Sequence, residues 1–223
     1  MATSGSTDFE LAVDDYIEEA FERCGLEIRT GYDLKTAKRS LNLLFADWAN
    51  RGLNRWTIVQ STVTLSQGTV EYTLDADTID ILSAVIRENA GATNQQDTTV
   101  NRIGRDTYLN LSSKLSQSKP TQYYIDRQIT PKIRVFPSPN TTYTLVIDRL
   151  TRIEDADSAT NTVDVPFRFY PCLAAGLAYY IAIKKAPDRI QILKSIYEEE
   201  FDRAASEDRD RTSLKILPYE RYL

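Results

Sequence analysis

Histidine is absent from this 223-residue chain, and cysteine occurs only twice. Without imidazole, the chain lacks the base of Ser-His and Cys-His nucleophiles, the side chain that titrates near neutral pH and a common metal ligand. Only eight glycines are present, and they form no phosphate-binding loop or G-x-S-x-G elbow. Most common catalytic designs are therefore missing, and we expect neither a cofactor nor a metal.

Long apolar runs are also absent. No stretch reaches the roughly 18 apolar residues that a membrane span needs, so we expect no membrane partner. The first residues, MATSGSTDFE, lack the basic start and apolar region of a secretory leader. Cys24 and Cys172 each lie among apolar neighbours in a helical pattern, which favours small buried core residues over a disulfide or a reactive thiol. We expect a soluble protein made inside a reducing cell.

The charge balance is mildly acidic, with 32 Asp and Glu against 27 Lys and Arg, a formal net charge of -5. Such a chain has no electrostatic footprint for wrapping a nucleic-acid backbone. Hydrophobic residues make up 42% of the sequence, which is enough for a globular core. Any contact with DNA should therefore be loose.

Helical periodicity marks both ends of the sequence. Apolar residues recur every three or four positions from Phe9 to Cys24, where Thr7 and Glu10 have capping-box spacing, and again from Asp33 to Gly52. Two further helices are predicted in VPFRFYPCLAAGLAYYIAIKKAP and in the segment after Pro187. The first of these is apolar nearly all round, which predicts a central helix that the others bury.

Between the helical segments, β-branched residues and tyrosine dominate. We predict strands in WTIVQSTVTL, TVEYTL, DILSAVIRE, TQYYIDR, KIRVFPSP and TYTLVIDRLTR, with SQG as a turn between the first two. NAGATNQQDTT is predicted to be a loop, and IGRDTYLNLSSKL to contain a short helix.

The predicted fold class is α+β: a four-helix bundle of two N-terminal and two C-terminal helices, with a large inserted β-rich module and an extended C-terminal tail. The predicted domain ranges are 1–55 for the N-terminal helical hairpin, 56–163 for the β module, 164–208 for the C-terminal helix pair and 209–223 for the tail.

The tail TSLKILPYERYL is unusually apolar for a chain terminus. It could be buried on a partner or pack back onto the bundle of its own chain. Its proline would stiffen it and reduce the entropy lost on docking. The residues concerned are Leu214, Ile216, Leu217, Pro218, Tyr219, Tyr222 and Leu223.

Three other groups of side chains allow a functional and a structural interpretation. Carboxylates spaced four apart on the first helix could serve a cell-wall glycosidase, or form a solvated helix face. Four tyrosines of the β module could stack on sugars, or pack in the core. A basic face on the second helix could meet phosphate, or be a solvated or subunit-facing surface. The pairs are Asp14/Glu18, Asp15/Glu19 and Glu18/Glu22; the tyrosines are Tyr108, Tyr123, Tyr124 and Tyr143; the basic residues are Lys35, Lys38 and Arg39.

Several long segments occur in an order with a known counterpart. IEEAFERCGLE, DLKTAKRSLNLLFADWANRGLNRWT, VTLSQGTVEYTLDADTIDIL, KPTQYYIDRQITPKIRVFPSP, DVPFRFYPCLAAGLAYYIAIKK and YEEEFDRAASEDRDRTSLKI follow one another along the chain. Together they resemble the head-to-tail adaptor proteins of short-tailed bacteriophages. The resemblance covers nearly all of residues 10–217.

The resemblance implies a structural virion protein rather than an enzyme. Such a protein would be one subunit of a homo-oligomeric ring, commonly of twelve copies, beneath the portal. The ring would bridge the portal to tail nozzle, needle or fibre proteins, and double-stranded DNA would pass through its lumen without sequence-specific binding. The apolar residues of the tail, Leu214 to Leu223, would grip the portal protein. Assembly would take place in the cytoplasm of the bacterial host.

Overall fold

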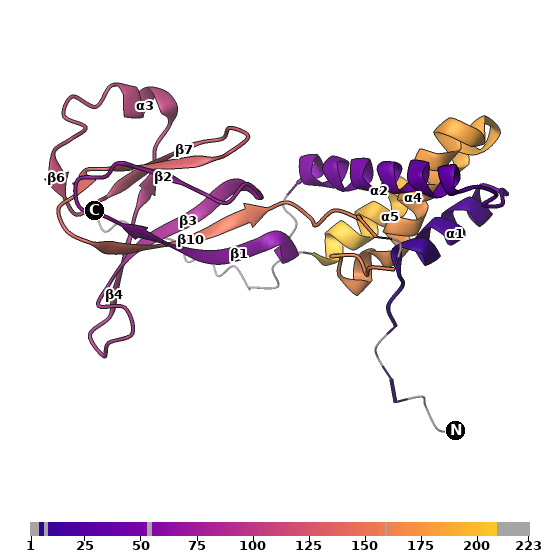
Figure 1. Cartoon of the computed structure of the whole chain (residues 1–223), viewed down its shortest axis with the longest axis horizontal. Helices are drawn as coiled ribbons and strands as arrows, with labels where there is room; N and C mark the ends of the chain where they lie inside the picture. The colour runs from indigo at the N-terminus through magenta and orange to yellow at the C-terminus, as the bar shows by residue number, and fades with distance from the viewer. Residues whose placement is uncertain (1–4, 7–8, 53–54, 159, 209–223) are drawn as a thin grey trace, which may run out of the picture. The chain divides into compact units, whose positions relative to one another are not determined.

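The computed structural model describes residues 5–6, 9–52, 55–158 and 160–208, and it is an α+β structure (Figure 1). The chain divides into two compact units, one of residues 1–44 and 156–223 and one of residues 45–155. We call them the helical unit and the β unit, and each is described by itself. The four domain ranges predicted from the sequence stay a prediction.

The helical unit is organised around one buried helix. Its helices are α1 (Val13–Arg23), the first part of α2 (Gly31–Arg51), α4 (Tyr170–Lys185) and α5 (Ile190–Glu207). Helices α1 and α5 both pack on α4, and α2 reaches it through Leu44, which lies against Gly176. The prediction of a central apolar helix is confirmed, because nine α4 residues are buried: Cys172, Leu173, Ala174, Ala175, Gly176, Leu177, Ala178, Ile181 and Ala182. A regular four-helix bundle remains a prediction.

The start of α1 differs from the sequence prediction. The helix begins at Val13, so Phe9 lies outside it, and the Asp15 carboxylate accepts the backbone N–H of Ala12 at 2.9 Å. Of the predicted cap, Thr7 lies outside the described residues and Glu10 precedes the helix, so the predicted start is wrong; Asp15 instead accepts the N–H of the residue before the helix. The predicted end is confirmed: Gly25 follows with a φ of +68°, a left-handed conformation that glycine adopts without steric cost.

Both helices of the C-terminal pair begin with a short 3-10 turn. Phe167–Phe169 precedes α4 and Pro187–Arg189 precedes α5. Pro166 and Pro187 fit these places because a residue at a helix start needs no intrahelical N–H donor. The predicted positions of both helices are confirmed within a few residues.

The β unit contains two four-stranded sheets. The first sheet has the order β1 (Ile58–Leu65), β10 (Tyr143–Thr151), β3 (Thr78–Glu88) and β4 (Gln96–Thr99), and every pair is antiparallel. The second has the order β2 (Glu71–Thr73), β8 (Lys132–Phe136), β7 (Gln122–Asp126) and β5 (Asn101–Arg102), with β5 parallel to β7. Strands β6 (Gln117–Ser118) and β9 (Ser138–Pro139) form a short parallel pair, α3 spans Arg105–Leu109, and a 3-10 turn spans Arg55–Thr57.

One hydrophobic core joins the two sheets. Side chains from both sheets contribute to it, as expected when two sheets bury their apolar faces against each other. The core consists of Leu65, Leu74, Ile81, Ala84, Ile86, Val100, Tyr123, Ile125, Ile133, Val135, Leu145 and Ile147.

The six predicted strand segments and the short helix are confirmed, but strands β4, β5 and β6 were not predicted. Strand β4 lies within residues 89–99, which were predicted to be a loop. All four of its residues are polar and exposed, so they give no hydrophobic pattern from which a strand could be predicted. The turn SQG was also uninformative about pairing. Strand β1 pairs with β10 and β2 with β8, so these neighbours in sequence belong to different sheets.

Candidate functional site

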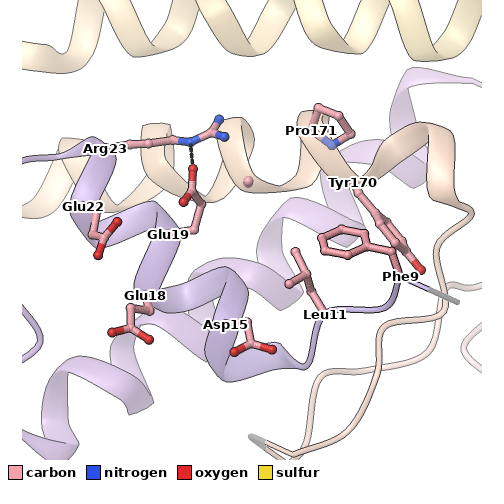
Figure 2. Close-up of a pocket in the computed structure, with 10 residues that line it drawn as sticks. Phe9, Leu11, Asp15, Glu18, Glu19, Glu22, Arg23, Tyr170 and Pro171 are labelled. Atoms are coloured by element: carbon pink, nitrogen blue, oxygen red, sulfur yellow. Dashed lines mark hydrogen bonds and ion pairs between the residues drawn. The ribbon is translucent and has the colours of Figure 1, made fainter. Parts of the chain in front are cut away.

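A groove of about 490 Å³ lies between α1 and the start of α4 (Figure 2). Its apolar part comes from Phe9, Leu11, Tyr170, Pro171 and Ala174, and its polar part from carboxylates and one arginine of α1. Tyr170 also contacts the exposed ring of Phe167, with 5.7 Å between ring centroids. The groove therefore combines exposed aromatic surface with a negatively charged wall.

The carboxylates of this wall are arranged as a surface rather than as a catalytic pair. Glu19 pairs with Arg23 at 2.7 Å, while Asp15 caps the helix. Glu18 and Glu22 are exposed, and within the described residues neither makes an ion pair. A glycosidase needs one carboxyl in a desolvated setting beside one that stays ionised. The groove brings together the pairs Asp15/Glu19 and Glu18/Glu22 but not Asp14, and it exposes both carboxylates of Glu18/Glu22.

Two of the three predicted basic residues of α2, Lys35 and Arg39, lie on one exposed stripe, whereas Lys38 is half-buried and donates to the backbone carbonyl of Asp157 at 3.4 Å. Tyr32, Lys35, Arg39 and Leu43 follow one another at helical spacing on the solvent side, and Tyr32 and Leu43 are 69% and 53% exposed. Lys184 of α4 extends the positive charge, because its ammonium donates to Ser40 Oγ at 2.7 Å. The pKa of Lys184 is lowered by burial and by the nearby charge of Arg39.

A nearly buried ion pair fixes α2 to α4. Lys185 of α4 donates to the carboxylate of Asp33, which also accepts the backbone N–H groups of Arg29 and Thr30 at 3.2 and 3.1 Å. The hydrogen bond from Lys185 is the largest cause that lowers the pKa of Asp33, from 3.8 to about 2. The Lys185 ammonium lies 5.2 Å from the ring centroid of Phe21 on α1, so this contact joins three helices.

The tyrosines of the β unit serve packing. Tyr123 and Tyr124 are both buried, and the ring of Tyr124 stacks on that of Tyr108 with 5.6 Å between centroids. Tyr143 is half-buried and donates its hydroxyl to Asn140 Oδ1 at 2.8 Å. These rings form no exposed stacking platform, so the structural interpretation holds for them.

Both cysteines are buried and neither forms a disulfide, as the sequence predicted. Cys24 donates to the backbone carbonyl of Ala178 at 3.2 Å, and burial is the main cause that raises its pKa. Within the described ranges, no cluster of three or more His, Cys, Asp or Glu could hold a metal. No helix in that part of the chain is long and apolar enough to cross a membrane.

The predicted tail contacts, Leu214, Ile216, Leu217, Pro218, Tyr219, Tyr222 and Leu223, lie outside the described residues. Asp208, the residue after α5, accepts a hydrogen bond from Arg168 in the turn before α4. The end of α5 is therefore tied to the start of α4.

The fold and these surfaces define a class of protein built for contact with other macromolecules: apolar and charged side chains lie together on exposed helix faces. Comparison with known families makes this specific. The model for the SU10 adaptor protein family matches residues 10–217, so the chain belongs to this family of phage head-to-tail adaptor proteins. A comparison with curated proteins found no match.

Family membership sets the general role of the protein. It is a structural adaptor of a bacteriophage, located in the virion and associated with portal and tail proteins. Proteins of this kind are in general not enzymes. The arrangement of the carboxylates on α1 agrees with a structural role.

Proposed function

We propose that the protein forms a ring, of about twelve copies as in the family it resembles, beneath the portal of a short-tailed phage. The ring bridges the portal to the tail nozzle, needle or fibre proteins and lines the channel through which DNA leaves the head. The family match over residues 10–217 is the observation that carries this proposal. The net charge of -5 supports it, because an acidic lumen repels phosphate and lets the duplex slide.

Residues 209–223 are the proposed portal-binding element. They carry Leu214, Ile216, Leu217, Tyr219, Tyr222 and Leu223 around Pro218. Each fully buried aliphatic side chain contributes about 1.5 to 3 kcal/mol before ordering costs, and a ring of subunits repeats that contribution. Pro218 supports this assignment, because a proline stiffens the segment and reduces the entropy lost on docking.

The test compares the full chain with a version cut after Arg211, each mixed with the cognate portal. Mass photometry measures how many copies bind and at what concentration. We expect the cut protein to bind at least about 100-fold more weakly, which corresponds to 2.7 kcal/mol per subunit. A matched variant with Leu214, Ile216 and Leu217 replaced by serine keeps the length and should show a similar loss. Equally tight binding of the cut protein would show that the tail is not the anchor.

A further inference from the structure

We propose that the acidic groove on α1 of one copy binds the basic stripe on α2 of the next copy. The acidic groove is the surface described above, with Asp15, Glu18 and Glu22 beside Phe9 and Tyr170. The basic stripe is Tyr32, Lys35, Arg39 and Leu43. The inference rests on the proposed ring, and it specifies which two surfaces make contact between subunits.

The charges of the two surfaces match in number and opposite sign. The solvent side of α1 carries five carboxylates and one guanidinium, a formal charge of about -4 at neutral pH. Lys35, Lys38, Arg39 and Lys184 give the surface around α2 a formal charge of about +4. Among the described residues, Lys35, Arg39, Asp14, Glu18 and Glu22 form no ion pair within their own copy. Each set is therefore available to a partner.

The spacing of the charges also matches. Lys35 and Arg39 stand four residues apart, as do Glu18 and Glu22, so each pair is separated by about 6 Å along its helix axis. Two such helices lying side by side can place both cations opposite both carboxylates in one register. In Figure 2, the side chains of Glu18 and Glu22 follow one another along α1.

Apolar side chains accompany the charges on both surfaces. Phe9 and Phe167, at the apolar end of the groove, are 61% and 70% exposed, and Tyr32 and Leu43 flank the two cations of the stripe. Apolar burial gives a contact its strength, whereas complementary charges select the partner and fix its register. A second copy of this chain supplies both, which is why we assign it as the occupant.

A contact between different surfaces of identical chains is heterologous. It leaves one unused groove and one unused stripe at the ends of every open assembly, so copies keep adding, and the assembly becomes a ring where the rotation between neighbouring copies closes. Within one copy the two surfaces do not pair, since among the described residues no ion pair links Glu18 or Glu22 to Lys35 or Arg39. The contact must therefore join separate copies.

Paired charge reversals test this directly. E18K/E22K brings the formal charge of the α1 surface from about -4 to about 0 and sets cations against Lys35 and Arg39, and K35E/R39E brings the α2 surface from about +4 to about 0 and sets carboxylates against Glu18 and Glu22. Sedimentation velocity on the full chain should show at least about tenfold weaker self-association for each variant alone. An equimolar mixture should assemble more tightly than either variant alone, because alternating copies again place opposite charges at these four positions. The control K194E/R105E reverses two exposed cations elsewhere and should have no effect.

A crosslinking arm covers the case in which copies meet only on the portal. One batch carries Glu18→Cys and the other Lys35→Cys, and a short bismaleimide is added to portal-bound mixtures. Covalent dimers should form in the mixture but not with either batch alone; the native cysteines are only 3% and 1% exposed, so they should not react. The inference would be overturned, and the proposed function left intact, by two results together: the mixture binds the portal without forming crosslinks, and neither charge-reversal variant changes self-association. If the original protein does not bind the portal, that result would instead refute the proposed function.

If DNA or a portal segment occupies these surfaces instead, the outcome differs. The K35E/R39E variant would then lose retention on DNA, or portal binding, and the mixture with E18K/E22K would not rescue it. That result would also overturn the proposed contact between copies.

Discussion

Replacement of Gly176 by alanine probes the closest approach of helices in the helical unit. Gly176 lies in the middle of α4, and a Cβ atom added there would be 2.9 Å from Leu44 Cδ2 and 2.9 Å from Tyr197 Cε2. Real Cβ atoms do not approach other heavy atoms so closely, so either the side chains or the helices must move. The Tyr197 ring also stacks on Tyr179, with 6.0 Å between centroids, which limits how far it can shift.

Two opposing effects set the size of the change. Alanine in place of glycine inside a helix is favourable by about 1 kcal/mol. Overpacking a core that is already filled costs about 1 to 3 kcal/mol. We therefore expect Gly176→Ala to lower the free energy of unfolding by about 1 kcal/mol. For a chain of this length, that corresponds to a midpoint about 2 to 4 °C lower in thermal unfolding followed by circular dichroism.

Gly31→Ala is the matched control, since Gly31 is the first residue of α2 and nothing lies within 4 Å of an added Cβ. It should leave the midpoint unchanged or raise it slightly. A second arm makes Gly176→Ala in a Leu44→Ala background, where one of the two close neighbours is shortened. In that background, Gly176→Ala should lower the free energy of unfolding by less than it does in the presence of Leu44. The difference between the two values measures the coupling between positions 44 and 176. A Gly176→Ala protein stabilised by the full helix-propensity gain would refute this account of the packing.

Two further predictions concern groups that the helical unit buries. The pKa of Asp33 is about 2 in the folded protein against 3.8 for an ordinary carboxyl, so its contribution to stability is complete above pH 4 and lost as the pH falls towards 2. In acid unfolding experiments, the stability difference between the original protein and Asp33→Asn should therefore shrink over that range; a constant difference would show that the charge of Asp33 is not responsible. The thiols of Cys24 and Cys172 should react with a thiol reagent only after unfolding, because both are buried and burial raises the pKa of Cys24. Rapid labelling of the native protein would contradict this.

The sequence alone determined the local structure of most elements. Helical spacing located α1, α2, α4 and α5, and the all-round apolar character of α4 predicted that other helices would bury it. The reason is physical: the period of apolar residues records which side of an element leaves water. The same reasoning identified Cys24 and Cys172 as core residues. It failed at β4, whose exposed polar residues carry no such record.

The pairing of distant segments was decided only by the tertiary structure. The turn between β1 and β2 did not indicate which strand either of them pairs with. In the structure β1 pairs with β10 and β2 with β8, so the two strands belong to different sheets. Tyr108 and Tyr124 could equally have faced solvent or each other, and only folding brought their rings together.

The candidate surfaces divide in the same way. The carboxylates of α1 and the cations of α2 could be read from spacing along each helix, since residues four apart share a face. That Phe9 and Tyr170, far apart in sequence, line one groove beside those carboxylates required the packing of α1 on α4. Periodicity shows which side of its own helix or strand a residue lies on. A binding surface also depends on which elements lie side by side, and long-range packing decides their arrangement.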